Sequence, residues 1–178
     1  KGGAIFDLEK LKWVNKEYIK KLPMEKVNDL LLERMPEIYK NADSFKRAIP
    51  VIVEHINVWL EVDKMVSNGE LKYLIAKPEL EVKNIFWKEN KDVVLLIRIL
   101  NEIISIIKSV DTSQFTEGQI KKALMPFAEK EGKGNVLWPM RYSLTGLLKS
   151  PDPFNVAYFL GKDEAIARLL NAISTIQK

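Results

Sequence analysis

The 178-residue sequence contains no cysteine and a single histidine. Without cysteine, the chain can form no disulfide, no thiolate nucleophile and no cysteine-ligated zinc or iron–sulfur site. The single histidine, His55, lies beside Glu54 in a predicted helix, where a solvated or hydrogen-bonded role is commoner than a catalytic one. We therefore expect no catalytic residue and no metal site in this chain. The lack of cysteine also fits a reducing compartment and favours the cytoplasm.

The sequence also lacks the glycine-rich loops that bind nucleotide phosphates. No G-x-G-x-x-G motif follows a strand, and neither Gly132-Lys133 nor Gly161-Lys162 has the earlier glycine of a P-loop. Nucleotide binding by either of these loops is therefore excluded.

No hydrophobic run is long enough to cross a membrane. The most apolar segment is residues 93–107, with eleven apolar residues of fifteen, whereas a membrane span needs about twenty. Attachment to a membrane surface is also disfavoured, because the basic residues do not line one face of a long amphipathic helix. We expect no membrane partner.

The net charge of +4 is unevenly distributed. Residues 1–22 and 118–178 are basic, and residues 23–117 are acidic. Such asymmetry is typical of a protein that binds a polyanion with particular surfaces, although solubility alone also produces differences of this size.

Apolar residues recur at three- and four-residue steps along most of the chain, whereas strand-like alternation is not convincing. Asp7 is predicted to cap the first helix, with Phe6 and Leu11 at the positions of a hydrophobic staple. Pro50 is predicted to kink or interrupt the third helix. The predicted helices cover residues 8–22, 24–35, 43–66, 93–107, 116–129, 136–148, 154–160 and 163–176, with a short helix over 70–75.

The segments between these helices suggest how the chain is divided. Residues 77–82 are predicted to be an extended connector, because the residue before a proline avoids helix. Residues 131–135 are predicted to be the most flexible segment, and residues 150–153, with two prolines, a rigid turn. We predict an all-α fold of two packed helical subdomains, residues 1–84 and 85–178.

Aromatic and charged residues within the helices allow further predictions. Trp13 and Trp59 lie on or beside apolar stripes and are expected to pack in the core. Trp87 and Trp138 are predicted to be more open, although packing is still favoured over the stacking of RNA bases. Arg98 is placed to pair with Glu102, four residues further along the same helix.

Two segments are more specific than a helical pattern. Residues 3–15 read GAIFDLEKLKWVN and are followed by EYI at residues 17–19. Near the other end stand PMRYSLTG at residues 139–146, SPDPF at 150–154 and LGKD at 160–163. In this order and separation, the segments resemble the C-terminal half of bacterial-type glutamyl-tRNA synthetases, a family of class I aminoacyl-tRNA ligases.

The resemblance implies a function for the chain and for the protein from which it would come. It implies an all-α anticodon-binding region that contacts tRNA(Glu) and lacks the catalytic site. The catalytic domain, with ATP and Mg²⁺ as its cofactors, would lie upstream and attach glutamate to the tRNA. The first residue is Lys1 rather than methionine, which fits an excised piece of a longer protein.

The resemblance also implies roles for individual residues. The positions of Arg141, Ser150, Pro151 and Pro153 line the family's pocket for the middle anticodon base, a uridine. The nearest match to an arginine that contacts the third base is Arg47 in FKRAI at residues 45–49, with Lys46 as a rival.

Four lysines are expected to contact the tRNA backbone rather than its bases. A planar guanidinium beside a proline-stiffened turn suits the reading of an unstacked base, whereas a lysine neutralises phosphates without reading sequence. The lysines are Lys121, Lys122, Lys133 and Lys149. The main alternative function is a non-catalytic helical module that binds another protein.

Overall fold

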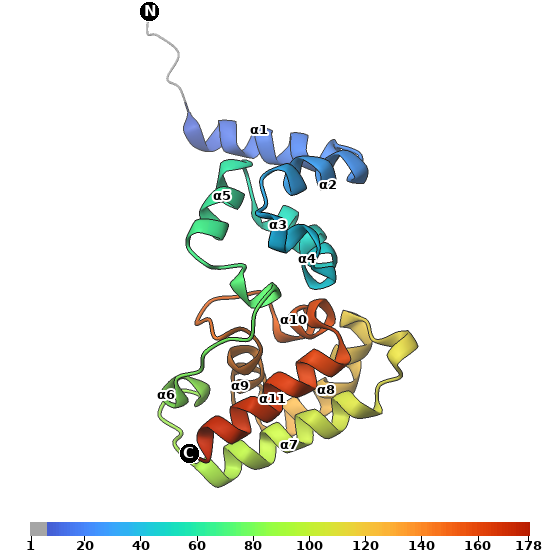
Figure 1. Ribbon diagram of the computed structural model, residues 1–178. Helices are drawn as coiled ribbons and strands as arrows, with labels where there is room; N and C mark the ends of the chain where they lie inside the picture. The colour runs from blue at the N-terminus through green and yellow to red at the C-terminus, as the bar shows by residue number, and fades with distance from the viewer. Residues whose placement is uncertain (1–6) are drawn as a thin grey trace, which may run out of the picture.

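A computed structural model describes residues 7–178, which fold into helices and no strand (Figure 1). The predicted all-α class is therefore confirmed. The first group of helices comprises α1 (Leu8–Lys21), α2 (Met24–Glu33), α3 (Glu37–Lys40), α4 (Asp43–His55), α5 (Leu60–Ser67) and the 3₁₀ helix η1 (Lys72–Leu74). The second comprises α6 (Val82–Ile85), α7 (Val93–Ser109), the 3₁₀ helix η2 (Thr112–Gln114), α8 (Glu117–Glu131), α9 (Lys133–Thr145), α10 (Pro153–Leu160) and α11 (Lys162–Ile176).

The two groups form an upper and a lower layer in Figure 1, with α1 at one end of the molecule and the C-terminus at the other. Helix α10 lies between the layers, because it packs against α4 above and against α8, α9 and α11 below. Helices α7 and α11 pack side by side at the base. The buried apolar side chains of both layers form one continuous core. None of the helices in residues 7–178 is both long and apolar enough to cross a membrane.

Several helices begin where a side chain can accept the free N–H groups of the first turn. The Asp7 carboxylate accepts hydrogen bonds from the backbone N–H groups of Glu9 and Lys10 at 3.0 and 3.1 Å, as predicted. The hydroxyl of Thr116 accepts from the N–H of Gln119 at the start of α8. The predicted staple cannot be compared, because Phe6 lies outside the described residues.

The prediction of one helix over residues 43–66 is wrong. Helix α4 runs through Pro50 without interruption and ends at His55, and Ile56 has extended backbone angles, with φ −97° and ψ 149°. The Glu61 carboxylate then accepts a hydrogen bond from the Asn57 N–H at 2.6 Å, just before α5 begins. The sequence signal was misleading because Ile56 continues the apolar stripe and is itself 1% exposed.

The prediction of a flexible segment at residues 131–135 is also wrong. A single residue, Gly132, with φ +92°, separates α8 from α9, and Gly134 lies inside α9. A Cβ atom on Gly134 would lie 2.3 Å from Nε1 of Trp87. Gly134 therefore permits the close approach of an indole ring, and Pro139 lies in the middle of α9 rather than in its first turn.

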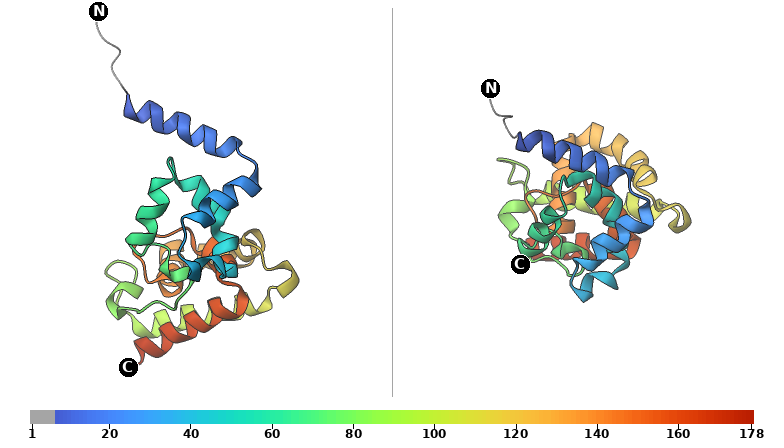
Figure 2. Two further views of the ribbon diagram at one scale, coloured as in Figure 1. Left: turned by 45° about the horizontal axis from the view of Figure 1, so that its top comes forward. Right: turned by 90° about the horizontal axis from the view of Figure 1, so that it is seen from above.

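Most of helix α1 lies on the surface. Ile19 is its only buried residue, whereas Trp13 is 62% exposed, which contradicts the prediction that Trp13 packs in the core. Leu11 and Tyr18, on the predicted apolar stripe, are also exposed. The reason is that α1 lies across the end of the upper layer, so few neighbours cover it (Figure 2). Trp59, in contrast, packs against the core.

A buried arginine joins the connector between the layers to the lower layer. Arg168 of α11 is 3% exposed, and its guanidinium donates to the carbonyl oxygens of Tyr73 at 2.8 Å, Leu144 at 2.7 Å and Ala76 at 3.1 Å. Its Nε also donates to Glu164 at 2.8 Å. A buried charge is tolerated when its donors are satisfied in this way. The division of the chain at residue 84 stays a prediction.

The predicted helix over residues 93–107 is present as α7, but its arginine has a different partner. Arg98 forms an ion pair of 2.5 Å with Glu131 at the end of α8 rather than with Glu102. This contact joins two helices, because the fold brings the end of α8 to the exposed side of α7.

Candidate nucleic-acid interface

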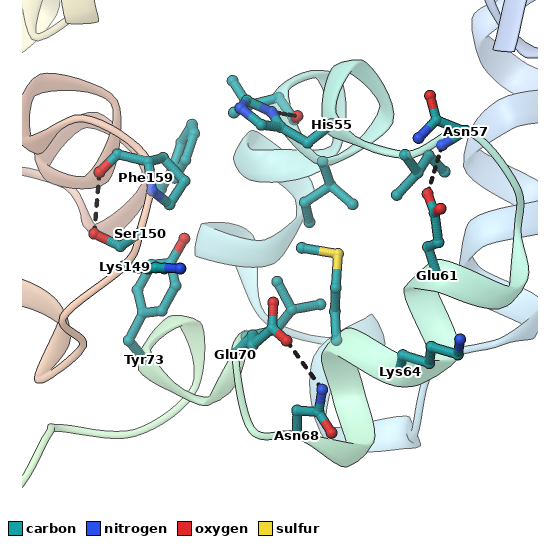
Figure 3. Close-up of a pocket in the computed structure, with 16 residues that line it drawn as sticks. His55, Asn57, Glu61, Lys64, Asn68, Glu70, Tyr73, Lys149, Ser150 and Phe159 are labelled. Carbon is teal, nitrogen blue, oxygen red and sulfur yellow. Dashed lines mark hydrogen bonds between the residues drawn. The ribbon is translucent and has the colours of Figure 1, made fainter. Parts of the chain in front are cut away.

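A cleft lies between the two layers. It has a volume of about 530 Å³ and opens between the α4–α5 corner, η1 and the turn at residues 149–151 (Figure 3). Its lining side chains come from segments about ninety residues apart in sequence. They are Val51, Ile52, His55, Ile56, Asn57, Glu61, Lys64, Met65, Asn68, Glu70, Leu71, Tyr73, Lys149, Ser150, Pro151 and Phe159.

One wall of the cleft is the turn predicted to be rigid. Lys149, Ser150 and Pro151 line it, and the Ser150 hydroxyl donates to the carbonyl oxygen of Pro151 at 3.1 Å. The Asp152 carboxylate accepts from the first backbone N–H groups of α10, which fixes the end of the turn. Pro153 is buried as the first residue of α10 and is not part of the lining.

Arg141 lies at the other end of this turn, outside the lining of the cleft. Its Nη2 donates to the carbonyl oxygen of Leu148 at 3.2 Å, and its Cζ lies 4.7 Å from the ring centre of Trp138. Trp138 is fixed in turn, because its indole N–H donates to the carbonyl oxygen of Asn84 at 3.0 Å and its ring packs against Trp87. Arg141 is half-buried as a residue, and its guanidinium forms no ion pair with an acidic side chain of residues 7–178.

The structure places Trp87 and Trp138 as packing residues, as predicted. Their ring centres are 5.5 Å apart, and the Trp87 indole lies against Gly134. Lys88 lies over the same Trp87 ring, with its Nζ 5.1 Å from the ring centre. Both indoles are therefore held by contacts within the protein.

Arg47 joins the two layers. Its Nε and Nη2 donate to the carbonyl oxygen of Phe159 at 2.8 and 2.6 Å, near the end of α10. A cation at the C-terminal end of a helix is favoured by the helix dipole and by the free carbonyl groups there. The contact of Arg47 with a base stays a prediction. Its rival Lys46 is exposed and lies 3.6 Å from Asp43.

The four predicted phosphate-binding lysines are not brought together. Lys149 lines the cleft, whereas Lys121 and Lys122 are exposed on α8. Lys133 begins α9 and lies 3.7 Å from Glu129. A tRNA backbone that contacts all four lysines would have to extend well beyond the cleft.

The charges around the cleft leave cations without a protein partner. Glu61 is engaged by the N–H of Asn57, and Glu70 by the side-chain amide of Asn68 at 3.1 Å. Lys64 and Lys149, in contrast, form no ion pair within residues 7–178. The cleft lining therefore carries two lysines without an ion-pair partner, beside two acidic side chains that accept hydrogen bonds from amides.

The half of the cleft lining that comes from α4, α5 and η1 was not predicted from the sequence. His55, interpreted as a bystander, lies at the rim and donates from Nδ1 to the carbonyl oxygen of Val51 at 2.7 Å. Tyr73 lies at the floor of the cleft (Figure 3). The α4–α5 corner brings these residues together, and the apolar pattern around Ile56 gave no signal for it. Across residues 7–178, no group of three or more acidic or histidine side chains is placed to hold a metal ion.

The chain is similar to known proteins over nearly its whole length. A glutamate–tRNA ligase from Clostridium kluyveri is 30% identical to this chain, and the match covers 99% of this chain and 36% of the ligase. A glutamate–tRNA ligase from Flavobacterium johnsoniae is 29% identical, and the match covers 99% of this chain and 34% of the ligase. Among solved structures, a glutamate tRNA ligase from Elizabethkingia meningosepticum superimposes with a TM-score of 0.68 at 29% identity. The match covers 99% of this chain and 34% of that one.

These matches confirm the resemblance found in the sequence, and they also show its extent. The chain spans about a third of the length of the curated relatives that it matches. The sequence model of a family described as "Anticodon binding domain" matches residues 9–173. The chain therefore belongs to the anticodon-binding domain family, in the form found in the C-terminal part of glutamate–tRNA ligases.

Proposed function

We propose that this chain binds the anticodon arm of tRNA(Glu) as part of a glutamate–tRNA ligase. The observation that carries the proposal is the cleft between the layers, where a stiff turn and two lysines without an ion-pair partner line a space of about 530 Å³. Reading an unstacked base requires hydrogen-bonding groups at fixed positions, and a turn held by Asp152 and two prolines provides them at little entropic cost.

Within this proposal, the residues named from the resemblance divide into two roles. Ser150 and Pro151 face the middle anticodon base in the cleft, and Arg141 reaches the same base from the other end of the turn, outside the lining. Pro153 supports the turn from the core, and Arg47 reads the third base. Lys149 contacts the phosphate next to the bound base, and Lys121, Lys122 and Lys133 contact the backbone further away.

The catalytic steps belong to the part of the relatives that this chain does not match. We propose that the whole protein activates glutamate with ATP and Mg²⁺ in that part, transfers it to the tRNA and acts in the cytoplasm. This chain then contributes recognition of the tRNA, and its own residues perform no chemical step.

A titration of the chain with anticodon stem-loop RNAs tests the proposal. The RNAs carry the glutamate anticodon or a single changed base at each of its three positions, and each titration is repeated over a range of salt concentrations. We expect tighter binding to the glutamate anticodon and a dissociation constant that rises with salt. Equal binding of all anticodons would contradict the proposal.

One observation favours the alternative of a protein-interaction module. The apolar stripe of α1, with Leu11, Val14 and Tyr18, is exposed, and exposed apolar patches mark contact surfaces. This alternative is the better account if the chain binds no RNA and forms a complex in analytical ultracentrifugation, either with a protein partner or with a second copy of itself. The substitution Leu11→Glu should then abolish that complex.

A further inference from the structure

The side chain of Tyr73 has a polar group without a protein partner. Tyr73 is 4% exposed as a residue, and its hydroxyl forms no hydrogen bond with a side chain or backbone group of residues 7–178. The hydroxyl is not among the fully enclosed side-chain atoms that lack a partner, so solvent in the cleft can reach it. Figure 3 shows the ring rising from η1 toward Lys149 and Ser150, so that the hydroxyl faces the cleft. A ligand in the cleft would therefore meet an unused hydrogen-bonding group.

The backbone that carries Tyr73 is fixed on both sides. The buried guanidinium of Arg168 donates to the Tyr73 carbonyl oxygen at 2.8 Å, and the same nitrogen donates to Leu144 at 2.7 Å. The hydroxyl of Ser44 donates to the carbonyl oxygen of Leu74, the next residue. These bonds fix the backbone from which the ring projects before any ligand arrives, which lowers the entropic cost of binding.

The chemistry of the hydroxyl restricts what it can recognise. Burial raises the pKa of Tyr73 above its ordinary value, and the nearby Arg168 opposes this only in part. The group is therefore neutral at physiological pH, and can both donate and accept a hydrogen bond. A neutral group that donates and accepts suits the edge of a nucleobase, whereas Lys149 at the rim suits a phosphate.

We propose that Tyr73 is a specificity-determining residue of the cleft, whose hydroxyl hydrogen-bonds the Watson–Crick edge of the nucleobase held against Ser150 and Pro151. This proposal rests on the proposed function, because it requires that an unstacked anticodon base enters the cleft. The Tyr73 hydroxyl, from the upper layer, would contact the base opposite Ser150 and Pro151, which belong to the turn of the lower layer. The base is thus recognised from both sides, and Arg168 acts as a positioning residue for the upper group.

The test compares Tyr73→Phe with Tyr39→Phe, each of which removes only a hydroxyl. Tyr39 is a matched control because it is also buried, packs against Phe45 and does not line the cleft. Both variants and the parent are titrated with stem-loops that carry the glutamate anticodon or a changed middle base, and their thermal unfolding is compared. We expect Tyr73→Phe to bind the glutamate anticodon about five- to tenfold more weakly, the usual loss for one hydrogen bond.

The same variant should also discriminate less between middle bases, while Tyr39→Phe behaves like the parent. A second measurement changes the RNA instead, with a middle pyrimidine that lacks the 4-oxygen and the N3 proton. The parent should lose as much affinity when uridine is replaced by this pyrimidine as it loses when Tyr73 is replaced by Phe. The Tyr73→Phe variant should bind the two RNAs with nearly equal affinity, because the change in the RNA and the change in the protein remove the same interaction. A parent that binds this RNA as tightly as the RNA with uridine would contradict the proposal even if the variant folds poorly.

The remaining outcomes overturn the proposal in different ways. If the parent discriminates middle bases and Tyr73→Phe does so equally, or weakens binding to all RNAs alike, the role of Tyr73 is wrong and the proposed function stands. If the parent itself ignores the anticodon, the proposed function fails and the role of Tyr73 fails with it.

Discussion

The guanidinium of Arg141 lies over the indole of Trp138, with its Cζ 4.7 Å from the ring centre, while its Nη2 donates to the carbonyl oxygen of Leu148. The cation–π contact and the hydrogen bond together hold the side chain beside the turn at residues 149–151. Since Asn84 fixes the indole of Trp138, the position of Arg141 depends on α6 as well as on α9. The remaining guanidinium N–H groups are available to a ligand that reaches this turn.

Replacement of Arg141 tests whether this geometry serves base recognition. Arg141→Ala should weaken binding of the glutamate anticodon stem-loop by about 1–3 kcal/mol and relax the preference for the middle base, as expected for loss of a base-reading arginine. Fluorescence anisotropy with labelled stem-loops measures both effects. Arg98→Ala removes an arginine on α7 that pairs with Glu131, and serves as the control. An unchanged ratio of affinities for matched and altered anticodons would exclude base reading by Arg141.

Lys149 should act on affinity without acting on sequence preference. Lys149→Ala is expected to weaken binding of all stem-loops alike and to reduce the slope of log Kd against log salt concentration by about one, because one phosphate contact is lost. Lys108 is exposed at the end of α7, and Lys108→Ala should leave the slope unchanged. If the two variants have the same slope as the parent, Lys149 contacts no phosphate.

Arg47 should contribute to stability whether or not it contacts a base. Arg47→Ala leaves the Phe159 carbonyl oxygen without two charge-assisted hydrogen bonds between α4 and α10, so the free energy of unfolding should fall by about 1.5–3 kcal/mol. Lys46→Ala, one residue earlier and exposed, should change it by less than about 0.5 kcal/mol. Urea unfolding followed by circular dichroism measures both. Equal stabilities of the two variants would show that Arg47 does not clamp the layers.

The caps and turns of the fold were predictable because their signals are local. Asp7 and Thr116 accept the first N–H groups of their helices, and Asp152 with its two flanking prolines defines a stiff turn that depends on few other residues. The break after α4 was not predictable, because Ile56 is apolar and fits the helical stripe although its backbone is extended. Local pattern cannot report a backbone angle that tertiary packing imposes.

The candidate site was predictable only on the side of the turn. Residues 149–151 are marked by Pro151 and by the resemblance of the surrounding segment, whereas Tyr73 and His55 carry no sequence signal of their own. Their contribution arises from packing between segments about ninety residues apart. The same holds for Gly134. The composition of residues 131–135 predicts a flexible loop, but the lack of a side chain at Gly134 is required by the close approach of Trp87, forty-seven residues earlier.

This contact provides a test of the fold around Arg141. Gly134→Ala would place a Cβ 2.3 Å from Nε1 of Trp87, so the indole must move, and we expect a loss of about 1–3 kcal/mol in the free energy of unfolding. Gly118→Ala in α8 meets nothing within 4 Å and should be neutral or stabilising by up to about 1 kcal/mol. Urea unfolding followed by tryptophan fluorescence compares the pair. If Gly134→Ala is as stable as Gly118→Ala, the close packing of Trp87 is wrong.

The central claim, that the cleft between the layers receives the middle anticodon base, is tested most directly by photo-crosslinking. A stem-loop with the glutamate anticodon carries 4-thiouridine at the middle position, and the crosslinked residue is identified by mass spectrometry after binding to the parent chain. We predict a crosslink to the cleft lining near Tyr73 or to residues 149–151. A bound stem-loop that crosslinks instead to α1 or α8 would contradict the claim.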